Sequence, residues 1–181
     1  MIGRTAFCFA IFALTAQGAE WTAPVEVQHE YKTCISYRAK YTGGVLVVEA
    51  AIAPGWHTFA MDNQQRQQEA LAGKPSLGIE LPTQVTLASG LTAQGPWFQT
   101  GPKDFSKPEI RWYSWGFERQ AVFAVKARPA ASGPARVGIR AQACTESVCK
   151  NVDVSLEVPH ADAKAVSGAP DVDLSALTRV R

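Results

Sequence analysis

The stretch A-R-V-G-I-R-A-Q-A-C-T-E-S-V-C-K-N-V-D-V-S-L-E-V, residues 135–158, contains two runs in which apolar and polar residues alternate. Successive side chains of a β-strand point to opposite faces, so the alternation predicts two strands, each with one apolar and one polar face. The four residues between the runs, Thr145 to Val148, are enough for a hairpin loop. The stretch therefore predicts an antiparallel ribbon in which Cys144 and Cys149 lie opposite each other on the polar face.

The opposed cysteines are the main candidate site. In a non-hydrogen-bonded antiparallel pair the Cα atoms lie about 4.5 Å apart, at the short end of the disulfide range. In the chain-entropy model, a disulfide that closes so short a loop contributes only about 2 kcal/mol to stability, whereas a bridge from Cys34 to Cys144 would contribute about 5 kcal/mol. Exposed disulfides are commonly the labile ones. These residues alone leave open whether the pair is redox-active or a structural staple of the hairpin.

A metal site is less consistent with the sequence. Two thiolates would need two further ligands to hold zinc or copper. The three histidines, His29, His57 and His160, show no ligand spacing. We therefore expect neither a metal nor another cofactor.

The rest of the chain also favours β-structure. Short runs rich in Val, Ile, Thr and aromatic residues alternate with Gly and Pro, which is typical of an all-β sandwich rather than of βαβ units. With 181 residues, the chain is long enough for one well-buried domain. The clearest predicted strands are Pro24 to His29, Cys34 to Tyr41, Val45 to Ala53, Trp56 to Ala60, Gly78 to Thr86, Ala121 to Arg128, Ala135 to Ala143, and Val152 to Val158.

Two of the remaining segments give more specific expectations. Val45 to Ala53, V-L-V-V-E-A-A-I-A, is apolar at both parities, so this strand should be central and covered on both faces. Asp62 can cap a helix in D-N-Q-Q-R-Q-Q-E-A-L-A-G, which Gly73 would end, although a loop with one helical turn fits nearly as well. The glutamines of this segment are expected on the solvated surface.

The first residues resemble an export signal. Arg4 precedes an apolar run from Ala6 to Ala16, and small residues up to Ala19 suggest cleavage before Glu20. An apolar run this short falls below the roughly twenty residues that span a bilayer, so a membrane anchor is the weaker alternative. We expect a signal peptide at 1–19, a domain at 20–160 and a flexible tail at 161–181, whose small and polar residues show little periodicity. The mature chain should then reach an oxidising compartment without membrane insertion.

Charge and the remaining cysteine narrow the interpretation further. The formal net charge is +2 and 19% of residues are charged, which does not suggest a nucleic-acid-binding surface. Export would leave three cysteines, so at least one thiol has no permanent partner within the chain. If Cys144 and Cys149 are bonded, Cys34 is the remaining one, and we expect it to be a buried, inert thiol.

Three motifs together resemble a known family. P-G-W-H-T-F at 54–59, K-P-S-L-G-I-E-L-P at 74–82 and Q-A-C-T-E-S-V-C at 142–149 are similar to the N-terminal periplasmic domain of the thiol:disulfide interchange protein DsbD. The resemblance covers most of the chain from Trp21 to Pro159. It implies an immunoglobulin-like β-sandwich in the periplasm, whose exposed cysteine pair relays electrons. The implied partners are thioredoxin-like periplasmic proteins, including those of cytochrome c biogenesis, and a membrane-embedded electron carrier.

The resemblance also implies roles for individual residues. Cys144 and Cys149 would form the redox pair, and Cys149 would make the mixed disulfide with partners. Lys150 beside Cys149 would favour its thiolate, while Glu146 lies nearer Cys144. An aromatic-tipped cap loop is expected within residues 104–115. Its candidates are Phe105, Trp112 and Tyr113, although core packing is an alternative for each.

Several features depart from this family or favour other interpretations. Four residues separate Cys144 from Cys149 where some members have five, and the membrane and thioredoxin-like domains of the family have no counterpart here. We therefore expect a stand-alone module. Trp56 is interpreted as core packing and His57 as a satisfied histidine, and neither is interpreted as a catalytic group. The alternative function is a non-catalytic sandwich that binds a partner through its aromatic-rich segment, residues 97–117, with the disulfide merely pinning a hairpin.

Overall fold

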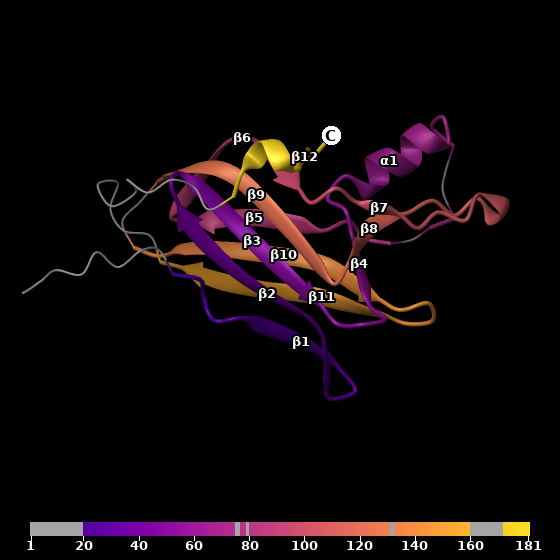
Figure 1. Ribbon diagram of the computed structural model, residues 1–181, viewed down its shortest axis with the longest axis horizontal. Helices are drawn as coiled ribbons and strands as arrows, with labels where there is room; N and C mark the ends of the chain where they lie inside the picture. The colour runs from indigo at the N-terminus through magenta and orange to yellow at the C-terminus, as the bar shows by residue number, and fades with distance from the viewer. Residues whose placement is uncertain (1–19, 75–76, 79, 131–132, 160–171) are drawn as a thin grey trace, which may run out of the picture.

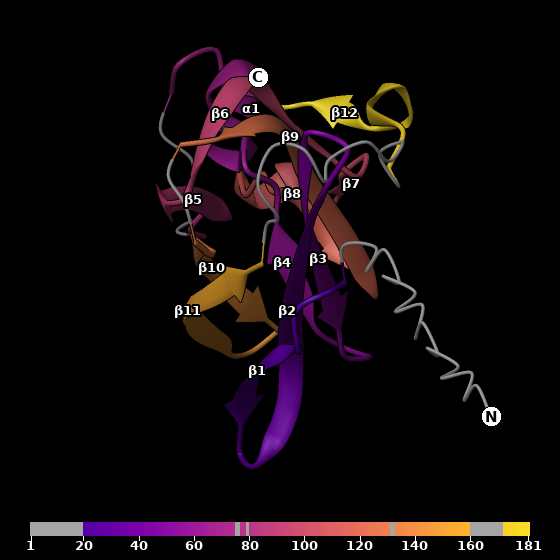
Figure 2. The same ribbon diagram turned by 90° about the vertical axis from the view of Figure 1, so that its left-hand side faces the viewer.

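The computed structural model describes residues 20–74, 77–78, 80–130, 133–159 and 172–181. Two antiparallel sheets pack face to face, as Figures 1 and 2 show from perpendicular directions. The chain is therefore an all-β, immunoglobulin-like sandwich, as the sequence predicted. The expected signal peptide at 1–19 lies outside the described residues, as does the first part of the expected tail up to residue 171.

The first sheet has the strand order β1-β2-β3-β9-β6-β12. Its strands are β1 (Val25–His29), β2 (Lys32–Thr42), β3 (Val45–Ile52), β9 (Gln120–Pro129), β6 (Leu91–Gln99) and β12 (Thr178–Arg179). β6 was absent from the sequence-based prediction because it does not alternate. Gly95, at φ +110°, and Pro96 interrupt it, and its register with β9 shifts between Ala93 and Trp97.

The second sheet has the order β11-β10-β4-β8-β7, and β5 also pairs with β10. Its strands are β11 (Cys149–Val158), β10 (Ala135–Cys144), β4 (His57–Phe59), β8 (Trp115–Glu118), β7 (Lys103–Asp104) and β5 (Gln84–Ser89). β5 begins later than predicted. The backbone N–H of Leu81 donates to the Gln142 side chain and Pro82 has no N–H, so the residues before Gln84 form a loop.

The space between the sheets holds a single large apolar core. It is built from the inward faces of alternating strands, so the residues predicted to share a face on β10 and β11 are buried together. Its largest fully buried side chains include Tyr37, Phe123, Ile139 and Leu156. This packing holds β10 and β11 in place, and their far end carries the two cysteines.

β3 is covered on both faces over its first residues, Val45 to Val48, as the two-sided apolar pattern predicted, whereas Ala51 on the outer face is exposed. Val45 and Val47 lie on the outer face of the first sheet, where Leu174 and Leu177 pack against them. These leucines belong to residues 172–181, here called the C-terminal segment, which forms η2 (Leu174–Ala176) and β12. In Figure 1 this yellow segment lies next to β9. The flexible-tail prediction is wrong for the C-terminal segment, because its leucines bury apolar surface and β12 pairs with β6.

The predicted helix is present as α1 (Asn63–Ala70), but two of its side chains differ from expectation. Asp62 makes no capping hydrogen bond and instead accepts from Arg66 Nε at 2.8 Å and Gln99 Nε2 at 2.7 Å. Gln67 is buried rather than solvated, and its amide donates to the Tyr113 carbonyl at 2.8 Å. These polar side chains connect α1 to β6 of the first sheet and to the segment before β8, which the weak apolar periodicity could not indicate.

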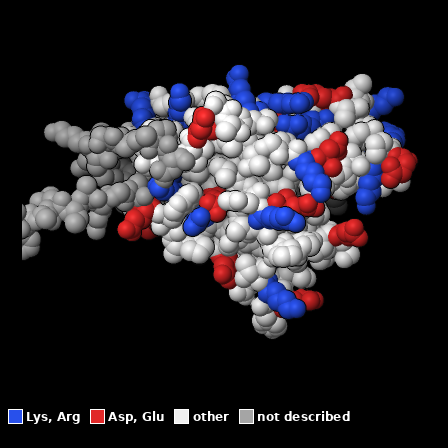
Figure 3. Space-filling view, in the orientation of Figure 1, with Lys and Arg blue, Asp and Glu red and all other residues white. Residues whose placement is uncertain are grey.

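Surface charge and helix length add little to this description of the fold. On the face drawn in Figure 3, basic and acidic side chains are interspersed rather than gathered by sign. Within the described ranges, no helix has both the length and the apolarity needed to cross a bilayer.

Candidate functional site

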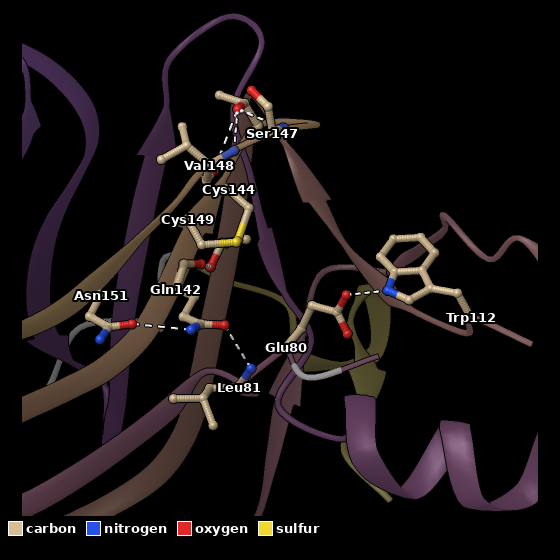
Figure 4. Close-up of a disulfide and its surroundings, with 11 residues drawn as sticks. Glu80, Leu81, Trp112, Gln142, Cys144, Ser147, Val148, Cys149 and Asn151 are labelled. Carbon is tan, nitrogen blue, oxygen red and sulfur yellow. Dashed lines mark hydrogen bonds between the residues drawn. A yellow bond between two sulfur atoms is a disulfide. The ribbon is translucent and has the colours of Figure 1, made fainter. Parts of the chain in front are cut away.

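The cysteines of the predicted ribbon form a disulfide. Cys144 and Cys149 are direct cross-strand partners at the ends of β10 and β11, with an S–S distance of 2.01 Å and a Cα–Cα distance of 4.0 Å. The intervening loop is closed by Thr145, whose N–H donates to the Val148 carbonyl at 2.8 Å and whose hydroxyl accepts from Val148 N at 3.1 Å. Figure 4 shows this loop above the disulfide. The ribbon holds both sulfur atoms in place by local contacts.

The two cysteines differ in exposure. Cys149 lies on edge strand β11 and is exposed, whereas Cys144 is only 2% exposed. Both lie on the outer face, as parity predicted, but the expectation that both are open to water is wrong for Cys144. Cys144 is covered from the side, because β4 pairs with the other edge of β10 at the end of that strand. A partner can approach Cys149, while Cys144 sits behind it.

Lys150 does not support the attacking role of Cys149 in the way the sequence suggested. Consecutive strand residues point to opposite faces, so Lys150 and Cys149 project to opposite sides of β11. The charge of Lys150 instead acts on Cys34, on the inner side of the sandwich. The case for Cys149 as the attacking thiol therefore depends on its exposure.

A row of four side chains crosses the outer face of the second sheet. The register pairs Cys149 with Cys144, Cys144 with His57, and His57 with Glu118. Directly opposed residues of antiparallel strands point to the same face, with Cβ atoms about 5 Å apart. We call Cys149, Cys144, His57 and Glu118 the disulfide row. His57 is half-buried on the outer face, and Trp56 packs against the core as expected.

The surroundings of His57 favour its neutral form. Burial lowers the pKa of His57 below its ordinary value, and the negative charge of Glu118 opposes this effect only in part. Glu118 is itself engaged with Lys103, whose Nζ lies 2.9 Å from Glu118 Oε2. At neutral pH the imidazole is therefore uncharged and has a nitrogen that can accept a proton.

The hairpin from Lys103 to Glu118, here called the cap hairpin, lies beside this row. It contains β7, the short helix η1 (Pro108–Ile110) and β8. Phe105 packs against His57 with ring centroids 5.3 Å apart. Of the three predicted cap aromatics, Phe105 is the one that the structure brings to the disulfide row.

The other two candidate aromatics have different positions. Trp112 faces Lys107 across the tip of the cap hairpin, and its indole N–H donates to the Glu80 carboxylate (Figure 4). Tyr113 stacks against Trp115 with ring centroids 6.4 Å apart. Trp112 thus ties the cap hairpin to the loop before β5, and Tyr113 packs within the hairpin itself.

The three sequence motifs meet at this end of the sandwich. The first reaches the site through His57, and the second through Leu81, whose N–H donates to Gln142 Oε1 at 2.9 Å. Gln142 also donates to Asn151 Oδ1 at 3.1 Å, so its side chain bridges β11 and the loop before β5, as Figure 4 shows. A groove of about 350 Å³ runs beside this bridge, lined by Leu81, Pro82, Gln84, Arg140, Ala141, Asn151, Val152 and Asp153. Sequence reasoning missed the groove because distant segments form it.

The remaining candidates lie away from this end or in the core. Cys34 is fully buried, its thiol donates to the Val27 carbonyl at 3.1 Å, and burial raises the pKa of this thiol. This confirms that Cys34 is buried, and its inertness stays a prediction. In the aromatic-rich segment 97–117, Trp97 and Trp115 pack against the core and Phe117 is buried. Across the described residues, no three or more His, Cys, Asp or Glu side chains are grouped so that they could hold a metal ion.

Comparison with known proteins found similar solved structures at low identity. No protein-family model and no curated protein matches the sequence. Among solved structures, the chain is similar to the reduced DsbD N-terminal domain of Neisseria meningitidis, with 15% identity, 70% of this chain and 86% of that chain covered, and a TM-score of 0.47. It is also similar to the complex between the DsbD N-terminal and PilB N-terminal domains of Neisseria meningitidis, with 14% identity, coverages of 75% and 96%, and a TM-score of 0.43.

A third similar structure is the GAE domain of GGA2p from Saccharomyces cerevisiae, with 6% identity, coverages of 76% and 98%, and a TM-score of 0.35. The DsbD N-terminal domain, which the three motifs resemble, is thus among the solved structures similar to this chain. At identities and TM-scores this low, function has to be argued from the chain's own residues.

Proposed function

We propose that this chain is an exported, periplasmic thiol:disulfide exchange module that relays electrons through Cys144 and Cys149. Its electrons would come from a membrane electron carrier and pass to disulfides of thioredoxin-like periplasmic proteins, the partners that the three motifs imply. The observation that carries the proposal is the asymmetry of the disulfide. One sulfur is exposed at a sheet edge and the other is held behind it.

The proposed reaction follows from this asymmetry. In the reduced pair, the thiolate of Cys149 attacks one sulfur of the partner disulfide, and the partner's other sulfur leaves as a thiolate and takes up a proton. The thiolate of Cys144 then attacks Cys149, which closes the intramolecular disulfide and releases the second partner thiol. Two electrons and two protons pass to the partner, and no cofactor is required.

The direct cross-strand position of the cysteines supports the second step. Cys144 needs no rearrangement of β10 or β11 to reach Cys149, because the two residues are already paired in the ladder. A nucleophile held next to its target gains the advantage of an intramolecular reaction. We propose that the cap hairpin, through Phe105, shields this pair from unrelated thiols until a partner binds.

The reduction potential of the pair tests this function. The protein is equilibrated in dithiothreitol buffers of defined ratio, and the redox state is read by alkylation and mass spectrometry. We expect a reduction potential above about −300 mV, because structural disulfides typically have potentials below that value. We also expect the oxidised protein to be reduced by a reduced thioredoxin-like protein.

An inert staple would give the opposite pair of results. A potential well below about −300 mV, together with no reaction with the thioredoxin-like protein, would contradict the proposed exchange. Cys34 serves as an internal control, because its buried thiol should stay unmodified by the alkylating reagent while the protein is folded.

A further inference from the structure

The buried cysteine has a chemical requirement that the exposed one does not share. A thiol attacks a disulfide only as its thiolate, and burial disfavours the charged form. Cys149 can lose its proton to water because it lies on the exposed sheet edge. Cys144 is 2% exposed, so its proton needs an acceptor inside the protein.

Apart from Cys149, which is bonded to the partner in the mixed disulfide, the register places one titratable side chain directly beside Cys144 on the same face. This side chain is His57, which opposes Cys144 across the β4–β10 ladder. Their Cβ atoms should lie about 5 Å apart, as in other directly opposed pairs. We propose that His57 accepts the proton of the Cys144 thiol and so generates the thiolate that resolves the mixed disulfide. This inference rests on the exchange function proposed above.

The other charged groups near the site are less well placed. Glu118 lies one strand beyond His57 in the disulfide row and is engaged by Lys103 from β7. Lys150 projects to the opposite face of β11, and Glu146 is exposed in the hairpin loop. The titratable groups that face His57 are therefore Cys144 on one side and the Glu118–Lys103 pair on the other.

Glu118 gives the imidazole a suitable second neighbour. A base that takes a thiol proton becomes an imidazolium, which a carboxylate stabilises. Before the transfer, burial keeps His57 neutral, so a ring nitrogen is free of a proton and can act as an acceptor. Cys144, His57 and Glu118 thus have the order nucleophile, base and carboxylate along the disulfide row. In this arrangement Glu118 is a positioning residue.

The proposed step balances as follows. The proton of Cys144 moves to a ring nitrogen of His57 as the Cys144 sulfur attacks the Cys149 sulfur of the mixed disulfide. The bond between Cys144 and Cys149 forms, and the bond between Cys149 and the partner breaks. The electron pair of the broken bond leaves on the partner sulfur, which takes a proton from the imidazolium or from water. The protein pair is oxidised and the partner is reduced.

The position of Phe105 favours proton transfer between Cys144 and His57. Its ring lies against His57, with centroids 5.3 Å apart, on the side of the cap hairpin. An apolar ring at this position limits the access of water to the imidazole. The proton then passes between Cys144 and His57 rather than to bulk solvent.

A thiol titration tests the inference without any redox partner. In a Cys149→Ser protein, thiolate formation at Cys144 is followed by its ultraviolet absorbance as a function of pH, and labelling with mass spectrometry identifies the reacting cysteine. We expect His57→Gln to reduce the Cys144 thiolate fraction at pH 7 about tenfold, which corresponds to one unit in the titration midpoint. The matched control is His29→Gln, because His29 lies in β1 on the other sheet and contacts Trp56.

Two outcomes would overturn the inference. One is a His57→Gln protein that titrates like its parent. The other is an equal effect of His29→Gln, which would indicate a general loss of structure. Glu118→Gln should change the thiolate fraction in the same direction as His57→Gln, by a smaller factor.

A second measurement keeps His57 in place in case its replacement prevents folding. The ring protons of His57 are followed by NMR against pH in the Cys149→Ser protein and in a Cys144→Ser/Cys149→Ser protein. Coupled groups titrate in two steps that belong to the pair. We expect a second inflection for His57 only when Cys144 is present, and identical single-step curves would overturn the inference.

The titrations and the reduction potential test the two proposals independently. If the potential shows an inert staple, the exchange function is lost, but the titrations still report whether His57 takes the proton of Cys144. If the pair exchanges disulfides while His57 titrates alone, the exchange function stands and the role assigned to His57 is wrong.

Discussion

The outer faces of the two sheets are both covered, but by segments of different chemistry. On the first sheet, Leu174 and Leu177 of the C-terminal segment pack on Val45 and Val47, and the contact is apolar. On the second sheet, the cap hairpin lays Phe105 over a row that contains two sulfur atoms, an imidazole and a carboxylate. The second cover lies beside groups that can exchange protons or electrons, whereas the first contact is between aliphatic side chains.

This difference teaches where to look for function in a sandwich of this kind. An apolar cover removes hydrophobic surface from water and contributes to stability. A cover over polar groups costs desolvation and perturbs their ionisation, which is a common property of reactive sites. Changes at the first cover should therefore alter stability alone, whereas changes at the second should alter chemistry.

The largest effect on folding is expected at Gly116 in β8. A Cβ added there would lie 2.1 Å from the Thr58 carbonyl oxygen, so β4 and β8 could not keep their present spacing. We expect Gly116→Ala to destabilise the fold by about 3 kcal/mol, as overpacking of a tight contact does. Because β4 carries His57, disulfide exchange should change as well. Urea unfolding followed by tryptophan fluorescence, together with an exchange assay, measures both.

Gly101 provides the control for this substitution. A Cβ added at Gly101 would have as its nearest neighbour the Thr178 hydroxyl at 3.6 Å, an ordinary contact distance. Gly101→Ala should therefore leave exchange unchanged. Equal destabilisation by the two substitutions would mean that the close approach of β8 to β4 is not a constraint on the fold.

Asp62 connects the start of α1 to the C-terminal segment, because it accepts a hydrogen bond from the Arg181 backbone N–H as well as from Arg66 and Gln99. Burial alone would raise the pKa of Asp62, but these hydrogen bonds outweigh burial and lower the pKa. We expect Asp62→Asn to lower the free energy of unfolding at pH 7 by about 2 kcal/mol, since the bonds to the charged carboxylate weaken. Urea unfolding measures the change.

The pH dependence of this effect has a definite sign. The folded-state pKa of Asp62 is below the unfolded value, so the folded protein binds fewer protons and the contribution is complete above about pH 4. It is lost as the pH falls through the folded-state pKa. The destabilisation by Asp62→Asn should therefore shrink in acid, and a difference that is constant with pH would exclude ionised Asp62 as its source.

The smallest effect is expected at the first cover. Leu177→Ala removes part of the apolar contact with β3, and because Leu177 is only partly buried we expect a loss of about 1 kcal/mol. The rate of disulfide exchange should equal that of the unchanged protein within error. A large change in exchange without a change in stability would show that the two covers are coupled chemically, against the comparison drawn above.

The two covers also show how much of the fold and site the sequence could predict. Alternation in residues 135–158 is a local property, so it predicted both strands, their shared faces and the opposition of Cys144 and Cys149. The two-sided apolar pattern of Val45 to Ala53 correctly required a cover on each face. It could not name the covering segment, because Val172, Leu174 and Leu177 are spaced among small and polar residues without the period of a strand or a long helix.

Local sequence patterns also could not predict which strand lies beside the disulfide, because that strand is distant in the sequence. Nothing within 135–158 indicates that β4 pairs with the end of β10, yet this pairing buries Cys144 and places His57 beside it. Parity could have excluded Lys150 as a neighbour of the Cys149 sulfur, since consecutive strand residues face opposite sides. The sequence therefore predicted the two sulfur atoms and, through the family resemblance, Phe105 of the cap hairpin, but it missed His57 and Glu118.

The most direct test of the central account is to trap the mixed disulfide. Cys144→Ser and Cys149→Ser proteins are each reduced and mixed with an oxidised thioredoxin-like protein, and the adducts are identified by mass spectrometry. We expect a stable adduct through Cys149 in the Cys144→Ser protein and at least about tenfold less through Cys144 in the other, because only Cys149 is exposed. Preferential trapping by Cys144, or no adduct with either protein, would contradict the account.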